Sequence, residues 1–191
     1  KIINLDLNKK TAESKNIKLY SNGAKINIQF AAKNILSNPH VKSQLNIGTL
    51  NPRRVAKNFD VTFPKTSDEK ALTKFNAALN IAATSTKINL SKIKLILDDT
   101  EIKGKASIPL SSAPTVHLNI NAINIDRYLP TPTKNKNTKK TNKNTKALEA
   151  ALIPVALLTQ VDLSTNIKIN NLQIKKTKWK NIQINAKAKQ G

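Results

Sequence analysis

The stretch INLSKIKL, residues 88–95, carries a short apolar pattern that returns twice further along the chain. The same spacing, apolar-x-apolar-x-x-apolar-x-apolar, recurs in LNINAINI (118–125) and in IKINNLQI (167–174). Strict alternation on both sides of the two-residue gap is typical of a β-strand with one apolar face. Because the gap reverses the phase, each copy is either one strand with a bulge or two strands at a bend.

Other segments alternate in the same way, with Lys, Asn, Thr and Gln opposite the apolar positions. They are residues 24–30, 75–83, 102–108 and 182–186, and the turn SNG at 21–23 indicates a hairpin. A recurring strand unit favours an extended sheet over a closed compact barrel. We therefore expect a mainly β fold: an extended, curved antiparallel sheet, groove-like and repeat-like, with one or two short helices.

Two helix starts and one linker divide the chain. NPRRVAKNF (51–59) places Asn51 at the N-cap and Pro52 at the first helical position, and Pro154 begins a second helix over 153–160. Residues 131–146 are almost entirely Lys, Asn and Thr, a composition that cannot bury a core. We expect a first sheet segment over 1–130 with its helix near 52–59, a linker over 131–146, and a helix with further strands over 147–191, all within one larger domain.

The charge is strongly basic, with 33 Lys and Arg against 11 Asp and Glu and a formal net charge of +22. Only three of the basic residues are Arg, which supplies the bidentate fork used for phosphate and guanine recognition. Aromatic residues, on which bases stack, make up 4%. We therefore expect no nucleic-acid partner, whereas attraction to an anionic lipid surface is physically reasonable.

The chain contains no Cys and no Met. Disulfides and thiolate metal sites are therefore excluded, and the missing initiator Met indicates a processed chain or a fragment. The longest apolar run, ALEAALIPVALL at 147–158, is interrupted by Glu149 and Pro154 and is too short for a span of about 18 residues.

Catalytic constellations are scarce in this sequence. His40 and His117 lie far apart, and neither a Gly-rich phosphate loop nor a nucleophile elbow is present. The acidic group of Asp98, Asp99 and Glu101 is either an acid/base or metal site or an ordinary hairpin turn, and we favour the turn. We expect a protein without enzymatic activity, with no catalytic residues, no metal and no cofactor.

A second polar group follows the middle copy of the pattern. Asp126, Arg127 and Tyr128 either meet a phosphate at an interface or fix a corner of the fold. We favour the corner, with Arg127 paired to Asp126 or to a carboxylate of the turn at 98–101.

Four segments, in order and spacing, carry a family resemblance. LNPRRVAKNFD (50–60), LILDDTEIKGKASI (95–108), LNINAINIDRYLP (118–130) and the segment 153–191 that begins IPVALLTQ resemble the AsmA family, over about residues 41–191. The high Lys and Asn content and the absence of an amino-terminal membrane anchor depart from the family pattern.

This resemblance implies a periplasmic protein of a Gram-negative bacterium, held at the inner membrane by an anchor absent from this chain and tied to outer-membrane biogenesis. Such proteins resemble bridge-type lipid carriers, in which a curved sheet forms a groove for phospholipid acyl chains. An alternative is a non-enzymatic scaffold that assists the assembly of outer-membrane proteins.

The one-sided strands independently suggest an apolar trough with a wet exterior, and such a trough would select weakly among lipid types. Each candidate groove residue could equally be an ordinary core residue. The candidates are Ile88, Leu90, Leu95, Ile102, Ile108, Leu118, Ile120, Ile167 and Ile169.

Overall fold

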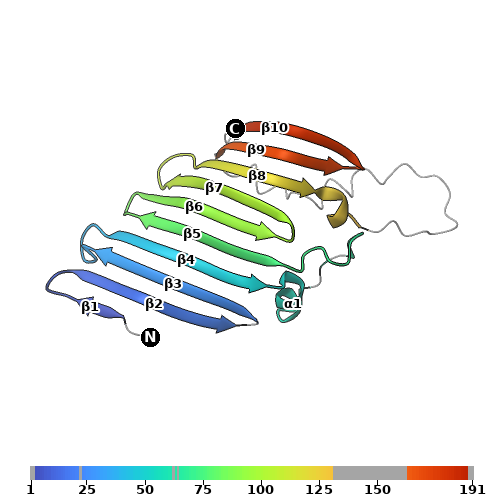
Figure 1. The fold of residues 1–191 in the computed structure, drawn as a ribbon. Helices are drawn as coiled ribbons and strands as arrows, with labels where there is room; N and C mark the ends of the chain where they lie inside the picture. Colours follow the sequence, from blue (N-terminus) through green and yellow to red (C-terminus); the bar gives the residue numbers. More distant parts are fainter. Residues whose placement is uncertain (1–2, 22, 62, 64, 131–162, 189–191) are drawn as a thin grey trace.

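The structure, a computed structural model, describes residues 3–21, 23–61, 63, 65–130 and 163–188. Within these ranges ten strands form one sheet, in which each strand pairs with its neighbours in sequence. Figure 1 shows the strands side by side in a single twisted layer, with β1 and β10 at opposite edges. The expectation of a mainly β, extended sheet is confirmed, and the sheet does not close into a barrel.

The strands have the following bounds: β1 Asn4–Asp6, β2 Thr11–Ser21, β3 Ala24–Lys33, β4 His40–Leu50, β5 Phe75–Ala83, β6 Lys87–Leu97, β7 Thr100–Pro109, β8 Thr115–Asn124, β9 Leu163–Ile174 and β10 Thr177–Ala188. One α-helix, α1 (Pro52–Lys57), follows β4, and one 3-10 turn, η1 (Ile125–Tyr128), follows β8.

One strand pair departs from the expected antiparallel order. β8 and β9 run parallel, whereas the other neighbouring pairs are antiparallel. Parallel neighbours need a connection of about a dozen residues or more. The chain between Asn124 and Leu163 is long enough for this, and most of it lies outside the described residues.

Each copy of the repeated pattern lies in one continuous strand, except that Ile125, the last residue of the second copy, begins η1. The alternative of two strands at a bend is therefore wrong. In β6 one extra residue interrupts the pairing with both neighbours, and Lys92 there has a φ of 50°. A bulge of this kind lets the apolar positions on both sides of it face the same way. In β8 and β9 the two gaps lie opposite each other and the register continues through them.

The helix expected near 52–59 is present. Asn51 caps α1 by accepting a hydrogen bond from the backbone N–H of Arg54 at 3.1 Å. The 3-10 turn η1 was not expected, and Asn124 caps it by accepting from the N–H of Asp126. The predicted linker (131–146) and second helix (153–160) lie outside the described residues.

The sheet has little closed core. None of the large described side chains is fully buried, and the buried apolar residues are mostly alanines together with Ile169. Domains usually bury a sheet face against a second layer. Here the described side chains of each face are shielded mainly by their neighbours on the same face.

Candidate functional site

A continuous apolar row crosses nine of the ten strands, from β2 to β10. Residues directly paired in a sheet point to the same side, so the pairing register alone defines the row. Its members are Leu19, Ile26, Ile47, Ala77, Leu95, Ile102, Ile120, Ile169 and Ile182. We call the side of the sheet that carries this row the apolar face.

The register brings the sequence-predicted groove candidates onto this one face. Four of them, Leu95, Ile102, Ile120 and Ile169, are consecutive members of the row. Ile88 pairs with Ile108, Leu118 pairs with Ile167, and Leu90 pairs with Ala106 on the same side.

The row extends beyond these candidates in both directions. Leu19, Ile26, Ile47 and Ala77 continue it across β2 to β5, and Ile182 continues it onto β10. The alternation of these strands is visible in the sequence. The strand register that aligns them with the candidates is not.

The apolar face keeps contact with solvent at its ends. Leu19 is 38% exposed and Ile184, beside the row on β10, is 43% exposed, whereas Ile169 near the middle is 7% exposed. Most other members of the row are half-buried. The face therefore offers an apolar surface that is partly open on the strands the structure describes.

The opposite side of the sheet is polar and cationic. Its central row runs through Lys18, Asn27, Asn46, Ala78, Lys94, Lys103, Asn119, Lys168 and Gln183. Glu101 on this polar face bridges two lysines, at 3.3 Å from Lys94 and 2.6 Å from Lys103. The hydrogen bond from Lys103 and then that from Lys94 hold the pKa of Glu101 below its usual value.

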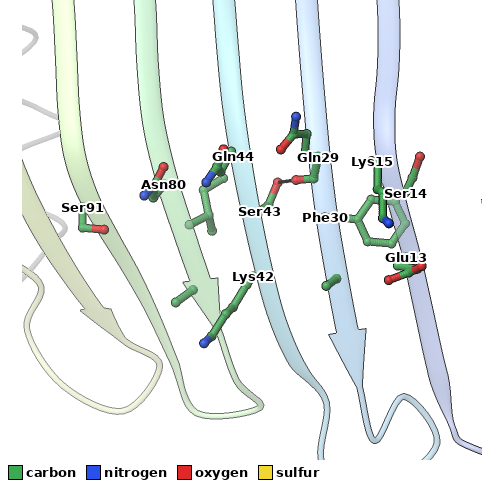
Figure 2. Close-up of a pocket in the computed structure, with 13 residues that line it drawn as sticks. Glu13, Ser14, Lys15, Gln29, Phe30, Lys42, Ser43, Gln44, Asn80 and Ser91 are labelled. Carbon is green, nitrogen blue, oxygen red and sulfur yellow. Dashed lines mark hydrogen bonds between the residues drawn. The ribbon is translucent and has the colours of Figure 1, made fainter.

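A shallow pocket of about 470 Å³ crosses β2 to β6. Most of the residues that line it, drawn in Figure 2, lie on the polar side of their strands. Gln29, Gln44 and Asn80 contribute amides, and the Ser43 hydroxyl donates to the backbone carbonyl of Gln29 at 2.9 Å. These groups suit hydrogen bonding to a polar ligand. None of the predicted groove residues lines this pocket.

The acidic group around residue 98 is part of the framework of the sheet. Asp98 and Asp99 form the turn between β6 and β7, which confirms the hairpin interpretation. The Asp98 carboxylate accepts from the N–H groups of Leu72, Thr73 and Lys74 at 2.8–3.1 Å. Burial raises the pKa of Asp98, but these donors outweigh burial and leave the net pKa below its usual value.

Arg127 and Tyr128 fasten η1 to this framework. The Arg127 guanidinium pairs with Asp68 at 2.7 Å and with Asp99 at 2.6 Å, and the Tyr128 hydroxyl donates to Asp98 at 3.1 Å. The predicted pairing of Arg127 with the turn carboxylates is therefore found through Asp99. The second partner, Asp68, was not anticipated, because it lies in a loop whose position depends on the tertiary fold.

Asp126, one of the expected partners of Arg127, has a different role. Its carboxylate accepts from the backbone N–H groups of Lys175 and Lys176 at 2.5 and 2.8 Å, and from the Gln173 amide. Lys175 and Lys176 form the β9–β10 turn with positive φ values. Asp126 thus holds this turn against η1, and the N–H of Lys176 is the main cause that lowers its pKa.

The described ranges hold no group of three or more His, Asp or Glu side chains able to bind a metal ion. His40 begins β4 and His117 lies on β8, so the fold leaves the two histidines on different strands. No helix among the described residues is long and apolar enough to cross a membrane.

Comparisons with known proteins found no match to this chain. No family model matches it, and neither the curated proteins nor the solved structures contain a match. Over the residues that the structure describes, fold and surface together define an open β-sheet protein with one apolar and one cationic face.

Proposed function

We propose that this chain is a periplasmic lipid-binding and lipid-transfer module involved in outer-membrane biogenesis, which holds phospholipid acyl chains on its apolar face. The observation that carries this proposal is the uninterrupted apolar row across nine strands, with part of its surface open. The resemblance to the AsmA family supports the compartment and the link to the inner membrane.

The dimensions of the row suit an acyl chain. Neighbouring strands lie about 4.8 Å apart, so a row across nine strands is roughly 38 Å long. The hydrocarbon core of a bilayer is about 30 Å thick and contains two leaflets. One row therefore exceeds the length of one leaflet, and each methylene it covers gains about 0.8 kcal/mol relative to water.

The chemistry of the row favours movement of the bound chain. It contains only aliphatic side chains, so no charged or hydrogen-bonding group fixes an acyl chain at one place. Contacts of this kind are non-directional. An acyl chain can therefore slide along the row without losing a specific interaction.

The test uses two neighbouring residues of β8 that face opposite sides. Native mass spectrometry of the chain purified from bacteria should show bound phospholipid. Leu118→Asp, on the apolar face, should abolish it, whereas Asn119→Asp, on the polar face, should leave it unchanged. Ile184→Asn provides a milder change at an exposed edge position and should reduce binding. A folded wild-type protein without lipid, or equal binding by all three variants, would contradict the proposal.

The open edge of the sheet supports a second candidate, a scaffold that assists outer-membrane proteins. β10 is a twelve-residue strand whose outer side pairs with no described strand. Exposed edges accept an added strand through main-chain hydrogen bonds. This function predicts photo-crosslinks from Gln183 on β10 to outer-membrane proteins, together with an apolar face free of lipid.

A further inference from the structure

A second pocket lies at the strand ends, beside η1. It has a volume of about 530 Å³, within the usual range for small-ligand sites, and β8, β9 and β10 contribute most of its lining. The residues around the pocket include both phases of these strands, but neighbouring residues of a strand point to opposite sides. The side chains that share one side and line the pocket are those of Ala122, Asn124, Asn171, Gln173, Lys178 and Lys180, whereas those of Ile123, Leu172 and Trp179 point to the other side of the sheet.

The pocket lies beside the part of the nine-strand row that crosses β8, β9 and β10. Ala122, Asn171 and Lys180 are paired across β8, β9 and β10, and all three line the pocket. Each lies two residues from a member of the row on its own strand, for example Ala122 from Ile120. A molecule whose chain lies on the row can therefore place its polar end in this pocket.

Charges of both signs line the same space. Arg127 is already committed to Asp68 and Asp99. The Asp99 side chain is nevertheless 89% exposed, and only its Oδ2 takes part in that pair. Lys178 and Lys180 form no ion pair with any residue that the structure describes. The pocket thus offers one available carboxylate and two available ammonium groups.

We propose that this pocket binds the zwitterionic headgroup of an amphiphile, one that carries a phosphate and a primary ammonium group. Lys178 and Lys180 bind the phosphate, while Asp99 accepts from the ammonium. The inference rests on the proposed function, because the acyl chain of the same molecule occupies the apolar face. It adds headgroup selectivity, which an aliphatic row alone does not supply.

The experiment measures binding by isothermal titration calorimetry. The protein is titrated with dihexanoyl phosphatidylethanolamine, dihexanoyl phosphatidylglycerol and the uncharged dihexanoylglycerol, each at a concentration at which it is monomeric. We expect saturable binding of dihexanoyl phosphatidylethanolamine. We expect about tenfold weaker binding of dihexanoyl phosphatidylglycerol, because it lacks the ammonium group that donates a charge-assisted hydrogen bond to Asp99.

Three variants separate the parts of the site. The double variant Lys178→Gln, Lys180→Gln should weaken the binding of both phospholipids about tenfold. Lys187→Gln, at the other end of β10, should leave both affinities unchanged. Asp99→Asn should remove the preference for the ethanolamine headgroup and leave the affinity for dihexanoyl phosphatidylglycerol unchanged. Circular dichroism confirms that each variant is folded.

The outcomes distinguish the two proposals. If dihexanoylglycerol binds and the two phospholipids bind equally, the headgroup site is wrong and the apolar face still binds lipid. An unchanged preference in Asp99→Asn also overturns the headgroup site. If neither the phospholipids nor dihexanoylglycerol bind, both proposals fail.

Discussion

Leu118 packs directly over Gly104 on the apolar face. A Cβ placed on residue 104 would lie 2.7 Å from Cδ2 of Leu118 and even closer to the backbone carbonyl oxygen of His117. The backbone oxygen cannot rotate away as a side chain would. Glycine at position 104 therefore permits the close approach of β7 and β8 and leaves room for Leu118.

We predict that Gly104→Ala destabilises the protein by about 1–3 kcal/mol, the usual cost of overpacking. The matched control is Gly48→Ala on β4, where the nearest atoms to an added Cβ are 3.4 Å away. Alanine in a strand is otherwise favoured over glycine by about 0.5–1 kcal/mol. Urea denaturation of the two variants measures the difference. Equal stability of the two would show that the strands move apart without cost.

The Asp98 turn gives a second prediction. Asp98 is 6% exposed, and its carboxylate satisfies three backbone donors and the Tyr128 hydroxyl. Asp98→Asn replaces one accepting oxygen with a donor that faces N–H groups, which should cost about 1–3 kcal/mol. Asp99→Asn is the control, because its side chain is largely exposed and bonded only to Arg127. A thermal shift in Asp99→Asn as large as that in Asp98→Asn would contradict this assignment.

The same carboxylates predict how stability depends on pH. Asp98 and Asp126 have folded-state pKa values below the ordinary value of 3.8. Their contribution is therefore complete above the ordinary value and is lost as the pH falls through 3.8 toward the folded-state values, because the unfolded chain then binds more protons. We expect a constant urea midpoint above about pH 5 and a decline below about pH 4. Asp98→Asn should flatten that decline. A midpoint that rises on acidification would contradict the prediction.

The sequence predicted the strands better than it predicted their partners. The alternation in residues 88–95 and 167–174 predicts which side of each strand is apolar, because this depends only on residues that are close together in the sequence. The alignment of Leu19 on β2 with Ile182 on β10 depends on bulges and on the parallel pairing of β8 with β9. These are properties of the assembled sheet, so the full length of the row could not be predicted.

The contacts of Arg127 and Asp98 beside η1 could also be predicted only in part. Arg127 was expected to bind a nearby carboxylate, and the partner Asp99 in the predicted turn was found. Asp68 and the backbone donors at Leu72 and Thr73 come from a loop with no periodic signal. Loops are placed by tertiary contacts, and their hydrogen bonds therefore appear only in the structure.

That loop supplies a last prediction, which compares two adjacent arginines of α1. Arg53 donates from Nε to the carbonyl of Ala71 and from Nη2 to the Thr66 hydroxyl, both at 2.7 Å, whereas the Arg54 side chain is exposed. Arg53→Gln should therefore release the loop and raise amide hydrogen exchange around residues 66–73 by about tenfold, since the loss of hydrogen bonds from a charged donor costs about 1.5–3 kcal/mol. Arg54→Gln removes the same charge from the same helix and should leave exchange in the loop unchanged. If both variants raise exchange equally, the effect comes from the helix charge, and Arg53 does not hold the loop through these two bonds.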